Sequence, residues 1–400
     1  MYGDSSSIFQ GKRILHLIGD SEFGGDTIYL FALANRMREF GGQVYIGTTA
    51  PETISRATRD GFPVLQVSAL RRPLHPVRDL LSVLSVFALC RRHRFDLVHT
   101  HTSKPGAVGR LAARLAGVPC VVHTIHGFAF HDRSSFLERA LYTNIERAAG
   151  LFCDAAISVN REDRVTAVRS RILRPNKVVT ILNGVDPARF HTPFDRDAFR
   201  RSLGVREGEI LVGCVGRMAP QKDPQRFLEA AKLVAEARPN VRCLFLGGGP
   251  LFPAMQEFAA GLGLDGRLLL PGFQRNVEDY LRALDVFVLN SLWEGLPIAL
   301  LEAMCVGLPI VATDIKGNRE CVDPSSAVLV PPGSAPALAE AVLRLVDNPD
   351  LAAGLARQAR LRFQAEFTQE RMLEQTFSLY ERLLLARARQ RCPSFHMPPG

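Results

Sequence analysis

Long apolar segments are missing from this chain of 400 residues. The longest apolar run, Leu80 to Cys90, falls well short of the ~20 residues that a membrane-spanning helix needs. Residues 1–13 contain no positively charged start followed by an apolar core, so we expect no signal peptide. Hydrophobic residues make up 47% and charged residues 22%, as in an ordinary globular protein, and we expect a cytoplasmic location.

Two kinds of short motif are also missing. The eight cysteines contain no C-x2-C spacing and most lie in apolar segments. We therefore expect reduced thiols in the core rather than disulfides or a zinc site. The complete G-x-G-x-x-G fingerprint is absent as well, which argues against a dinucleotide-dependent dehydrogenase.

Apolar segments of strand length alternate with helical patterns along the chain. The predicted strands lie at 14–18, 44–47, 64–67, up to His99, and at 120–127, 155–160, 178–184, 209–218, 241–249, 267–272, 286–290, 309–313 and 327–330. The predicted helices lie at 27–40, 76–93, 107–115, 136–149, 161–170, 224–237, 253–262, 277–284, 297–306 and 335–348. Such alternation predicts an α/β fold with parallel sheets that are covered by helices on both faces.

The alternation is interrupted once. Residues 184–197 contain two prolines and no periodicity, and the strand–helix pattern restarts after them. A chain of this length is too long for one typical core. We therefore predict two tandem Rossmann-like domains, at 1–188 and 189–369.

Positive charge is concentrated in one segment. The net charge is +9, and the segment 71–114 holds nine basic residues against Asp79 and Asp96. The nine are Arg71, Arg72, Arg78, Arg91, Arg92, Arg94, Lys104, Arg110 and Arg114. Such a basic face attracts an anionic membrane surface, or it is a solvated face with no partner. No recognition helix or aromatic strand motif accompanies the charge, so we expect no nucleic acid partner.

Two turns have the composition of anion sites. Gly24 and Gly25 separate the first strand from the first helix, where bare backbone amides can hold an anion, although such turns also need glycine for geometry alone. In "GRMAPQKD", Arg217 ends a strand and Lys222 precedes a helix that begins near Pro224. Two cations beside the carboxyl end of a strand suit a diphosphate; the alternative is that both are surface charges.

Histidines and one D-x-D sequence raise the question of a metal. His99, His101, His123, His126 and His131 have spacings that match no standard zinc pattern, so we predict no metal site. We expect imidazoles at strand ends in a cleft, with His126 the most exposed to it. The D-x-D sequence of residues 195–197 resembles a metal–diphosphate motif, but it precedes a helix, so we predict helix capping.

The segment "EGLPIALLE" holds two acids, Glu294 and Glu302, in an apolar context. Pro297 places a helix start beside it, so Glu294 lies in the preceding loop and Glu302 inside the helix. Eight helical steps rise about 12 Å, whereas glycosidases hold their carboxyl groups at about 5–9.5 Å across one bond. The pair is therefore no acid/base couple. The acids either bind two parts of an extended ligand or are a surface acid and a paired core acid.

Together these motifs resemble the bacterial family 4 glycosyltransferases, which are retaining enzymes with the GT-B architecture of two Rossmann-like domains facing a central cleft. The resemblance rests on Gly24–Gly25, on "HTHTSKPGAVGRLAARLAGVP" with "HTIHG", on "GRMAPQKD" and on "EGLPIALLE". It implies an N-terminal acceptor domain, a C-terminal donor domain, and a C-terminal helix at about 370–388 that packs back on the first domain.

The resemblance also implies a site. Catalytic residues would be His126, Arg217, Lys222 and Glu294. Donor-binding residues would be Gly24, Gly25, Gly216, Arg217, Lys222, Gly248, Phe273, Val277, Glu294, Gly295, Leu296, Pro297 and Glu302. His101 and Lys104 would lie on the acceptor side. No metal or other cofactor is expected, and the donor is a nucleotide sugar, with UDP favoured.

Retention follows from the absence of an obvious carboxylate nucleophile: we expect attack on the face that the diphosphate leaves. The acceptor would be a lipid-linked or polysaccharide glycan at the inner face of the membrane. Three alternatives remain at this point. They are a nucleotide-sugar 2-epimerase that acts on the donor alone, a phosphorylase, which is longer and needs a cofactor lysine, and an exported two-lobed binding protein.

Overall fold

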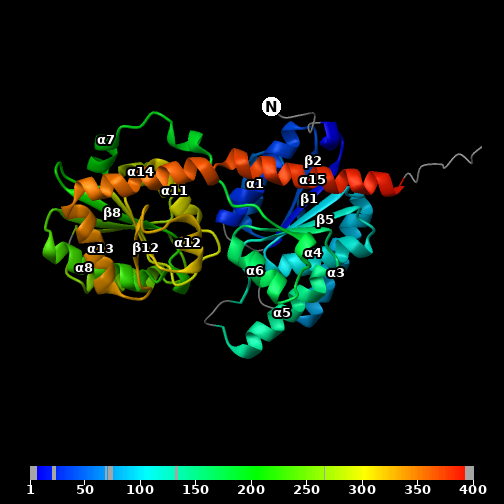
Figure 1. The fold of residues 1–400 in the computed structure, drawn as a ribbon, viewed down its shortest axis with the longest axis horizontal. Coiled ribbons are helices and arrows are strands. Elements are labelled where there is room, and N and C mark those ends of the chain that lie inside the picture. The colour runs from blue at the N-terminus through cyan, green and yellow to red at the C-terminus, as the bar shows by residue number, and fades with distance from the viewer. Residues whose placement is uncertain are drawn as a thin grey trace, which may run out of the picture. The chain divides into compact units, whose positions relative to one another are not determined.

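The computed structural model describes residues 7–19, 24–67, 70, 75–130, 134–264 and 266–391. These residues form two compact units (Figure 1). Unit 1 contains the residues up to Leu182 and those from Glu370 onward, and unit 2 runs from Asn183 to Gln369. The division thus follows Leu182, whereas the sequence predicts it after residue 188.

Unit 1 is built on a seven-stranded parallel sheet in the order β3-β2-β1-β4-β5-β6-β7. Its strands are β1 (Arg13–Gly19), β2 (Gln43–Thr48), β3 (Val64–Gln66), β4 (Leu97–His101), β5 (Cys120–Ile125), β6 (Ala155–Ser158) and β7 (Val178–Thr180). Its helices are α1 (Gly25–Glu39), α2 (Pro51–Arg59), α3 (Pro76–His93), α4 (Ser103–Leu115), α5 (Phe136–Gly150), α6 (Arg161–Arg169) and α15 (Gln369–Arg391).

Helices cover the two faces of this sheet with separate apolar clusters. Leu30 of α1 and Tyr380 of α15 belong to one cluster, and Val86 of α3 and Ala112 of α4 belong to the other. Strands with both faces covered are continuously apolar, which is why the sequence shows unbroken apolar runs here.

Unit 2 repeats the plan with six parallel strands in the order β10-β9-β8-β11-β12-β13. The strands are β8 (Ile210–Val215), β9 (Val241–Leu246), β10 (Leu268–Gly272), β11 (Val286–Leu289), β12 (Ile310–Thr313) and β13 (Val328–Val330). The helices are α7 (Arg196–Ser202), α8 (Pro224–Ala237), α9 (Phe252–Ala260), α10 (Val277–Ala283), α11 (Ile298–Val306), α12 (Lys316–Cys321), α13 (Ala335–Asp347) and α14 (Pro349–Glu366).

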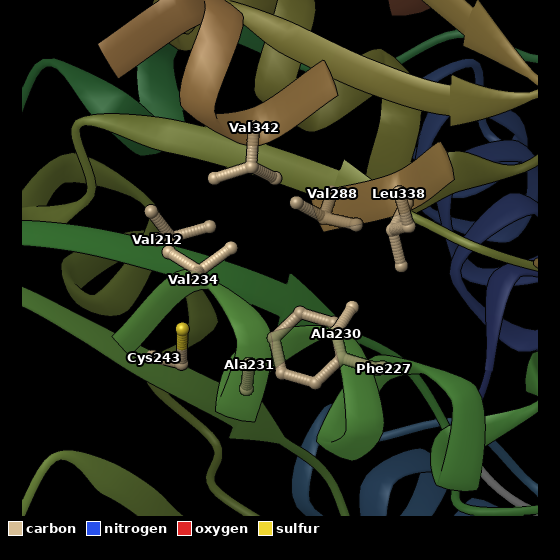
Figure 2. A pocket seen from close by; sticks show the side chains of 9 residues that line it. All are labelled: Val212, Phe227, Ala230, Ala231, Val234, Cys243, Val288, Leu338 and Val342. Atoms are coloured by element: carbon tan, nitrogen blue, oxygen red, sulfur yellow. The ribbon is translucent and has the colours of Figure 1, made fainter. Parts of the chain in front are cut away.

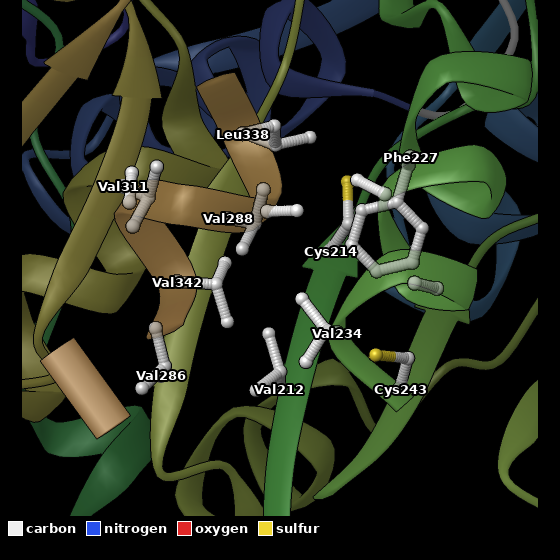
Figure 3. Packing of buried hydrophobic residues seen from close by; sticks show 14 of the residues in the cluster. Val212, Cys214, Phe227, Val234, Cys243, Val286, Val288, Val311, Leu338 and Val342 are labelled. Atoms are coloured by element: carbon white, nitrogen blue, oxygen red, sulfur yellow. The ribbon is translucent and has the colours of Figure 1, made fainter. Parts of the chain in front are cut away.

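The main core of unit 2 lies between this sheet and the helices α8 and α13. Val212 and Val288 of the sheet face Val234 of α8 and Val342 of α13 (Figure 3). A gap within this core is lined only by apolar and sulfur-containing side chains (Figure 2). Because it offers no polar group to a ligand, we assign it to packing and not to a binding site.

The strand order of each sheet reverses at one point. In unit 1 the reversal lies between β1 and β4, and in unit 2 between β8 and β11. Ligands of such sheets bind beside the carboxyl ends of the strands at the reversal. The loops that follow β8 and β11 contain Lys222 and Glu294, so the topology brings the two predicted motifs to one edge of the sheet.

Most predicted elements are present, but a few differ. The sequence analysis did not identify α2, α12 or α14, and it ended β4 near His99, whereas the strand continues through His101. Helix α11 begins at Ile298 with Pro297 as its N-cap. The expectation of reduced core thiols is confirmed for the seven cysteines in the described residues, which are free and buried. Within the described part of the chain, no helix is long and apolar enough to cross a membrane.

Candidate functional site

Lys222 and Glu294 form an ion pair at the carboxyl ends of β8 and β11. Lys222 ends a short 3-10 turn, Pro220–Lys222, and Glu294 lies in the loop before α11. The Glu294 carboxylate also accepts hydrogen bonds from Ser291 Oγ at 2.6 Å and Gln221 Nε2 at 3.1 Å. Its side chain is only 8% exposed. Three donors therefore fix its orientation.

Hydrogen bonds to backbone carbonyls join the two loops that carry this pair. Leu292 N donates to Gln221 O at 2.8 Å, and Gln221 Nε2 donates to Trp293 O at 2.9 Å. Asn290 Nδ2 donates to the carbonyl of Asp223 at 2.7 Å. Asp223 has a left-handed backbone with φ of 46°, so this bond stabilises a conformation that costs energy in a non-glycine residue.

Glycines allow several segments to approach one another closely at this edge of the sheet. A Cβ atom on Gly247 would lie 2.0 Å from the carbonyl oxygen of Gly216, and one on Gly317 would lie 2.5 Å from that of Glu294. A Cβ atom on Gly248 would lie 3.4 Å from the Cβ atom of Phe273. The structure thus places the predicted residues Gly216, Gly248 and Phe273 around one edge of the sheet. Arg217, in the same loop as Gly216, is exposed.

Glu302 lies inside α11 and is buried, with a side chain that is 6% exposed. Arg189 Nη1 donates to its Oε1 at 3.0 Å, and Arg189 Nη2 lies 3.5 Å from Glu278 Oε2. Burial raises the pKa of Glu302, and the charge of Arg189 partly offsets that rise. Among the described residues, the hydrogen bond from Arg189 engages Oε1 and not Oε2.

Sequence reasoning missed Gln221, Ser291 and Arg189. Gln221 directly precedes Lys222 and Ser291 lies three positions before Glu294, so their closeness in sequence was an available signal. Arg189 belongs to the segment that the sequence analysis treats as a linker, and it lies 113 positions from Glu302. No local pattern indicates such a pair. The other predicted donor residues adjoin the site in sequence: Gly295–Pro297 lead into α11, and Val277 begins α10.

The expectation that the histidines lie at strand ends is wrong for His99, inside β4, and for His123, inside β5, whereas His101 ends β4 as expected. All three side chains are buried, because their strands are covered on both faces. Both ring nitrogens of His101 lie within hydrogen-bond distance of other imidazoles, so neither nitrogen is left to contact the acceptor substrate directly. His126 follows β5 and is partly exposed. His131 lies outside the described residues.

A fourth buried histidine, His16 of β1, completes the group, and the sequence analysis missed it. Ring nitrogens of His16, His99 and His101 lie within 4.8 Å of one another, close enough for one metal ion. However, His99 is already bound by two hydroxyl groups, Tyr380 OH at 2.6 Å and Thr124 Oγ1 at 2.7 Å. Hydrogen bonds therefore account for these nitrogens without an ion.

The other site residues predicted in unit 1 are Gly24, Gly25 and Lys104, which do not belong to the histidine group. Gly24 is the N-cap of α1 and Gly25 its first residue. Lys104 Nζ forms an ion pair with Asp79 Oδ1 at 2.6 Å. The predicted capping role of the D-x-D sequence in unit 2 is confirmed, because Asp195 Oδ1 accepts from Ala198 N at 2.9 Å.

The predicted basic face is smaller than the sequence suggests. Arg110 is fully buried and bonded to Glu146, and Arg114 pairs with Asp154. Arg71 and Arg72 lie outside the described residues. The exposed basic residues of the segment are Arg78, Arg91, Arg92 and Arg94.

Two Rossmann-like units, with an acid and cations at the carboxyl edge of the second sheet, define a glycosyltransferase of the GT-B class. Comparisons with known proteins agree. Residues 23–189 match the family model "Glycosyltransferase Family 4", and residues 195–362 match "Glycosyl transferases group 1". The chain belongs to the family 4 glycosyltransferases.

Among its relatives is the UDP-Gal:alpha-D-GlcNAc-diphosphoundecaprenol alpha-1,3-galactosyltransferase of Escherichia coli. It is 38% identical over 264 residues, which cover 65% of this chain and 68% of the relative. The lipopolysaccharide core biosynthesis mannosyltransferase LpsB of Rhizobium meliloti is 32% identical, over 56% of this chain and 67% of the relative.

Solved structures share the fold. Anabaena Alr3699/HepE in complex with UDP has a TM-score of 0.78 and 22% identity, over 92% of this chain and 100% of the other. WaaG, a glycosyltransferase involved in lipopolysaccharide biosynthesis, has a TM-score of 0.74 and 18% identity, over 92% and 99%. At these identities the likeness establishes the GT-B architecture.

Proposed function

We propose that this enzyme transfers a sugar, with retention of configuration, from a UDP-sugar to a lipid-linked or polysaccharide acceptor of the cell envelope. The observation that carries the proposal is the Lys222–Glu294 pair at the carboxyl edge of the unit 2 sheet. The names of the relatives support the substrate classes: the first one uses UDP-Gal and a diphosphoundecaprenol-linked acceptor, and HepE binds UDP.

The donor would extend along the edge of the sheet. Arg217 and Lys222 would bind the diphosphate, with the bare amides of Gly216 beside them. The base would lie near Gly248, Phe273 and Val277. Gly24 and Gly25 of unit 1 stay predicted phosphate contacts.

The two acids would bind different hydroxyl groups of this donor. Glu302 Oε2 would accept from the ribose diol, while Arg189 keeps Oε1. A carboxylate has about four lone-pair positions, and Glu294 already uses three of them. One more hydrogen bond, from a hydroxyl group of the transferred sugar, would use the fourth acceptor position of the Glu294 carboxylate. Gly295–Pro297 would contact the same sugar.

The same saturation argues against Glu294 as a covalent nucleophile. The bond between the anomeric carbon and the diphosphate oxygen would break, and charge would develop on the diphosphate next to Lys222 and Arg217. The acceptor oxygen would attack the same face, and its proton would pass to a phosphate oxygen of the donor. Fixed cations supply the charge stabilisation, so we propose that the reaction needs no metal.

In unit 1, His126 would contact the sugar near the reacting centre, and Lys104 stays a predicted acceptor-side residue. His101 also stays a predicted acceptor-side residue, and because it is buried with its Nδ1 3.3 Å from His126 Nε2, it would act through His126.

A donor-consumption assay tests this proposal. The enzyme is incubated with each of a panel of nucleotide sugars, with and without a polyprenyl-diphosphate-linked glycan. We expect release of UDP and a product with the anomeric configuration of the donor, and only when the acceptor is present. An inverted product would refute retention. Conversion of the donor to an epimer without acceptor would favour the epimerase alternative.

We also propose that unit 1 docks on an anionic membrane surface through α3 and α5, which both pack against α4. Large apolar side chains are exposed on these two helices: Val77, Leu80, Leu81, Leu84, Phe136, Leu137 and Leu141. Exposed arginines, Arg78 and Arg139, lie among them. Apolar groups that enter the interface, combined with cations that attract anionic lipid, are typical of peripheral binding.

Co-sedimentation with vesicles tests this docking. The wild-type protein should bind vesicles of phosphatidylglycerol more strongly than neutral vesicles, and the double variant Leu80→Asp/Leu84→Asp should bind neither. Leu233→Asp, on the exposed side of α8 in unit 2, is the matched control and should bind like the wild type. Equal binding of the double variant and the control would contradict the proposed face.

A further inference from the structure

A chain of three imidazoles connects the thioether of Met37 to His126 in unit 1. His16 Nε2 lies 3.3 Å from Met37 Sδ, and His16 Nδ1 lies 3.0 Å from His101 Nε2. His101 Nδ1 in turn lies 3.3 Å from His126 Nε2. Met37, His16 and His101 are fully buried, whereas His126 is partly exposed. The chain thus runs from the apolar core to an accessible ring.

All three imidazoles are neutral at ordinary pH. Burial lowers the pKa of His16 to about 3 and that of His126 to about 4, and for His126 the charge of Asp26 acts in the opposite direction. Burial, reinforced by neighbouring histidines, holds the pKa of His101 well below its usual range. A neutral imidazole has one N–H donor and one acceptor nitrogen, so each ring can donate in only one direction.

The thioether fixes that direction because sulfur of this kind only accepts. His16 Nε2 must therefore carry the proton and donate to Met37 Sδ, which makes His16 Nδ1 an acceptor. His101 Nε2 must then donate to His16, and His101 Nδ1 accepts. By the same step His126 Nε2 donates to His101, and His126 Nδ1 is left with a lone pair.

Within the described residues, neither of the two remaining histidines branches from the chain. His99 packs against His101 with ring centroids 4.3 Å apart, but its own nitrogens are bound by Tyr380 and Thr124. His123 is bound by Thr100. Met37 thus sets the direction of the three hydrogen bonds from the buried end, while the charge of Asp26 acts on His126 at the other end.

We propose that Met37, His16 and His101 are positioning residues that hold His126 in the tautomer protonated on Nε2, so that its Nδ1 accepts a hydrogen bond from a sugar hydroxyl. The identity of the group that donates to His126, a sugar hydroxyl, rests on the proposed function, whereas the predicted tautomer of His126 does not depend on it. His126 would then orient the sugar as an acceptor and would not act as a general acid. A sugar with a carboxylate or a hydrogen in place of that hydroxyl would bind less well.

Nuclear magnetic resonance of the ligand-free enzyme, labelled with 15N-histidine, tests the tautomer directly, since two-bond 15N–1H spectra distinguish the two nitrogens. The variant His126→Gln assigns the signal. We expect the wild type to show His126 protonated on Nε2 alone. In Met37→Leu, which conserves volume but removes the acceptor, both tautomers of His126 should appear. His16→Phe, which removes the acceptor of His101, should have the same effect.

The matched control is Met372→Leu, because Met372 is a buried methionine of the same apolar cluster and has no imidazole partner among the described residues. It should leave the His126 signals unchanged. A wild-type His126 that is protonated on Nδ1 or charged would overturn the proposal, and so would identical His126 spectra in the wild type, Met37→Leu and His16→Phe. If the tautomers are as expected but no sugar is transferred, the proposed function fails and the positioning chain stands.

Discussion

At the scale of single residues, Glu294 differs from an ordinary surface acid in the number of groups that hold it. Lys222, Gln221 and Ser291 all donate to its carboxylate, and its side chain is 8% exposed. In the proposed function, a charged side chain held so firmly would orient the sugar and would also keep Lys222 in place for the diphosphate. The charge of Glu294 should therefore matter for turnover.

Glu294→Gln tests the role of that charge. The amide keeps the size of the side chain but leaves Lys222 without its counter-charge and changes an acceptor into a donor. We expect kcat to fall by roughly 100-fold, with a smaller change in KM, because the misplaced cation stabilises the leaving group less well. The matched control is Glu229→Gln in α8, which affects only a partly exposed pair with Arg226 and a hydrogen bond from Gln225. Unchanged kcat in Glu294→Gln would contradict the assignment.

Sequence alone predicted the residues whose motif places them next to a strand end. Lys222 and Glu294 are 72 positions apart, yet each follows a strand, and parallel strands end at the same edge. Arg189, His16 and Met37 were not predictable in this way. Their partners are set by how helices and loops pack on the sheet, and the strand that holds His16 shows only an apolar run.

At the scale of elements, α4 carries a buried cation into the interface with α5. Arg110 is fully buried, its Nη2 donates to Glu146 Oε2 at 2.6 Å, and its Nε donates to Gly106 O at 2.8 Å. The sequence analysis assigned Arg110 to a basic face because a pattern of charges does not show which side of a helix is covered by other elements.

Removing one partner of this pair should destabilise unit 1. Arg110→Met leaves the Glu146 carboxylate buried without its counter-charge and should cost about 3–5 kcal/mol of unfolding free energy. The double variant Arg110→Met/Glu146→Leu should recover most of that loss. Urea unfolding of the wild type, both single variants and the double variant measures the coupling. A double variant less stable than Arg110→Met would contradict this account.

Buried histidines give the strands of unit 1 an acid sensitivity. Burial lowers the pKa of His16 to about 3 and holds the pKa values of His99, His101 and His123 well below normal. Below pH ~6.5 the unfolded chain takes up protons that the folded chain does not. The stabilisation is therefore complete above pH ~6.5 and is lost as the pH falls toward these lowered values.

Each such histidine should contribute up to about 1.4 kcal/mol per pH unit to this loss. Unfolding free energies measured between pH 7 and pH 5 give the slope. We expect His123→Gln to reduce this slope by up to about 1.4 kcal/mol per pH unit, the contribution of one proton, because the amide does not titrate. A stability that is flat across this range would contradict the buried neutral state.

At the scale of the whole molecule, two units share one plan in which the strand order reverses once. The alternation of strands and helices predicted this plan, since each strand is a continuous apolar run between amphipathic helices. It did not predict α2 and α12. The latter has only six residues and approaches Glu294 closely at Gly317, so its place depends on packing and not on a periodic pattern.

The central claim concerns unit 2: its sheet edge binds the diphosphate of a nucleotide sugar through Lys222. Calorimetric titration of UDP, UMP and uridine into the wild type and Lys222→Met measures that claim directly. We predict that the wild type binds UDP far more tightly than uridine, and that Lys222→Met weakens UDP binding by about 10- to 100-fold while uridine binding is unchanged. Equal UDP affinity in the two proteins would contradict the account.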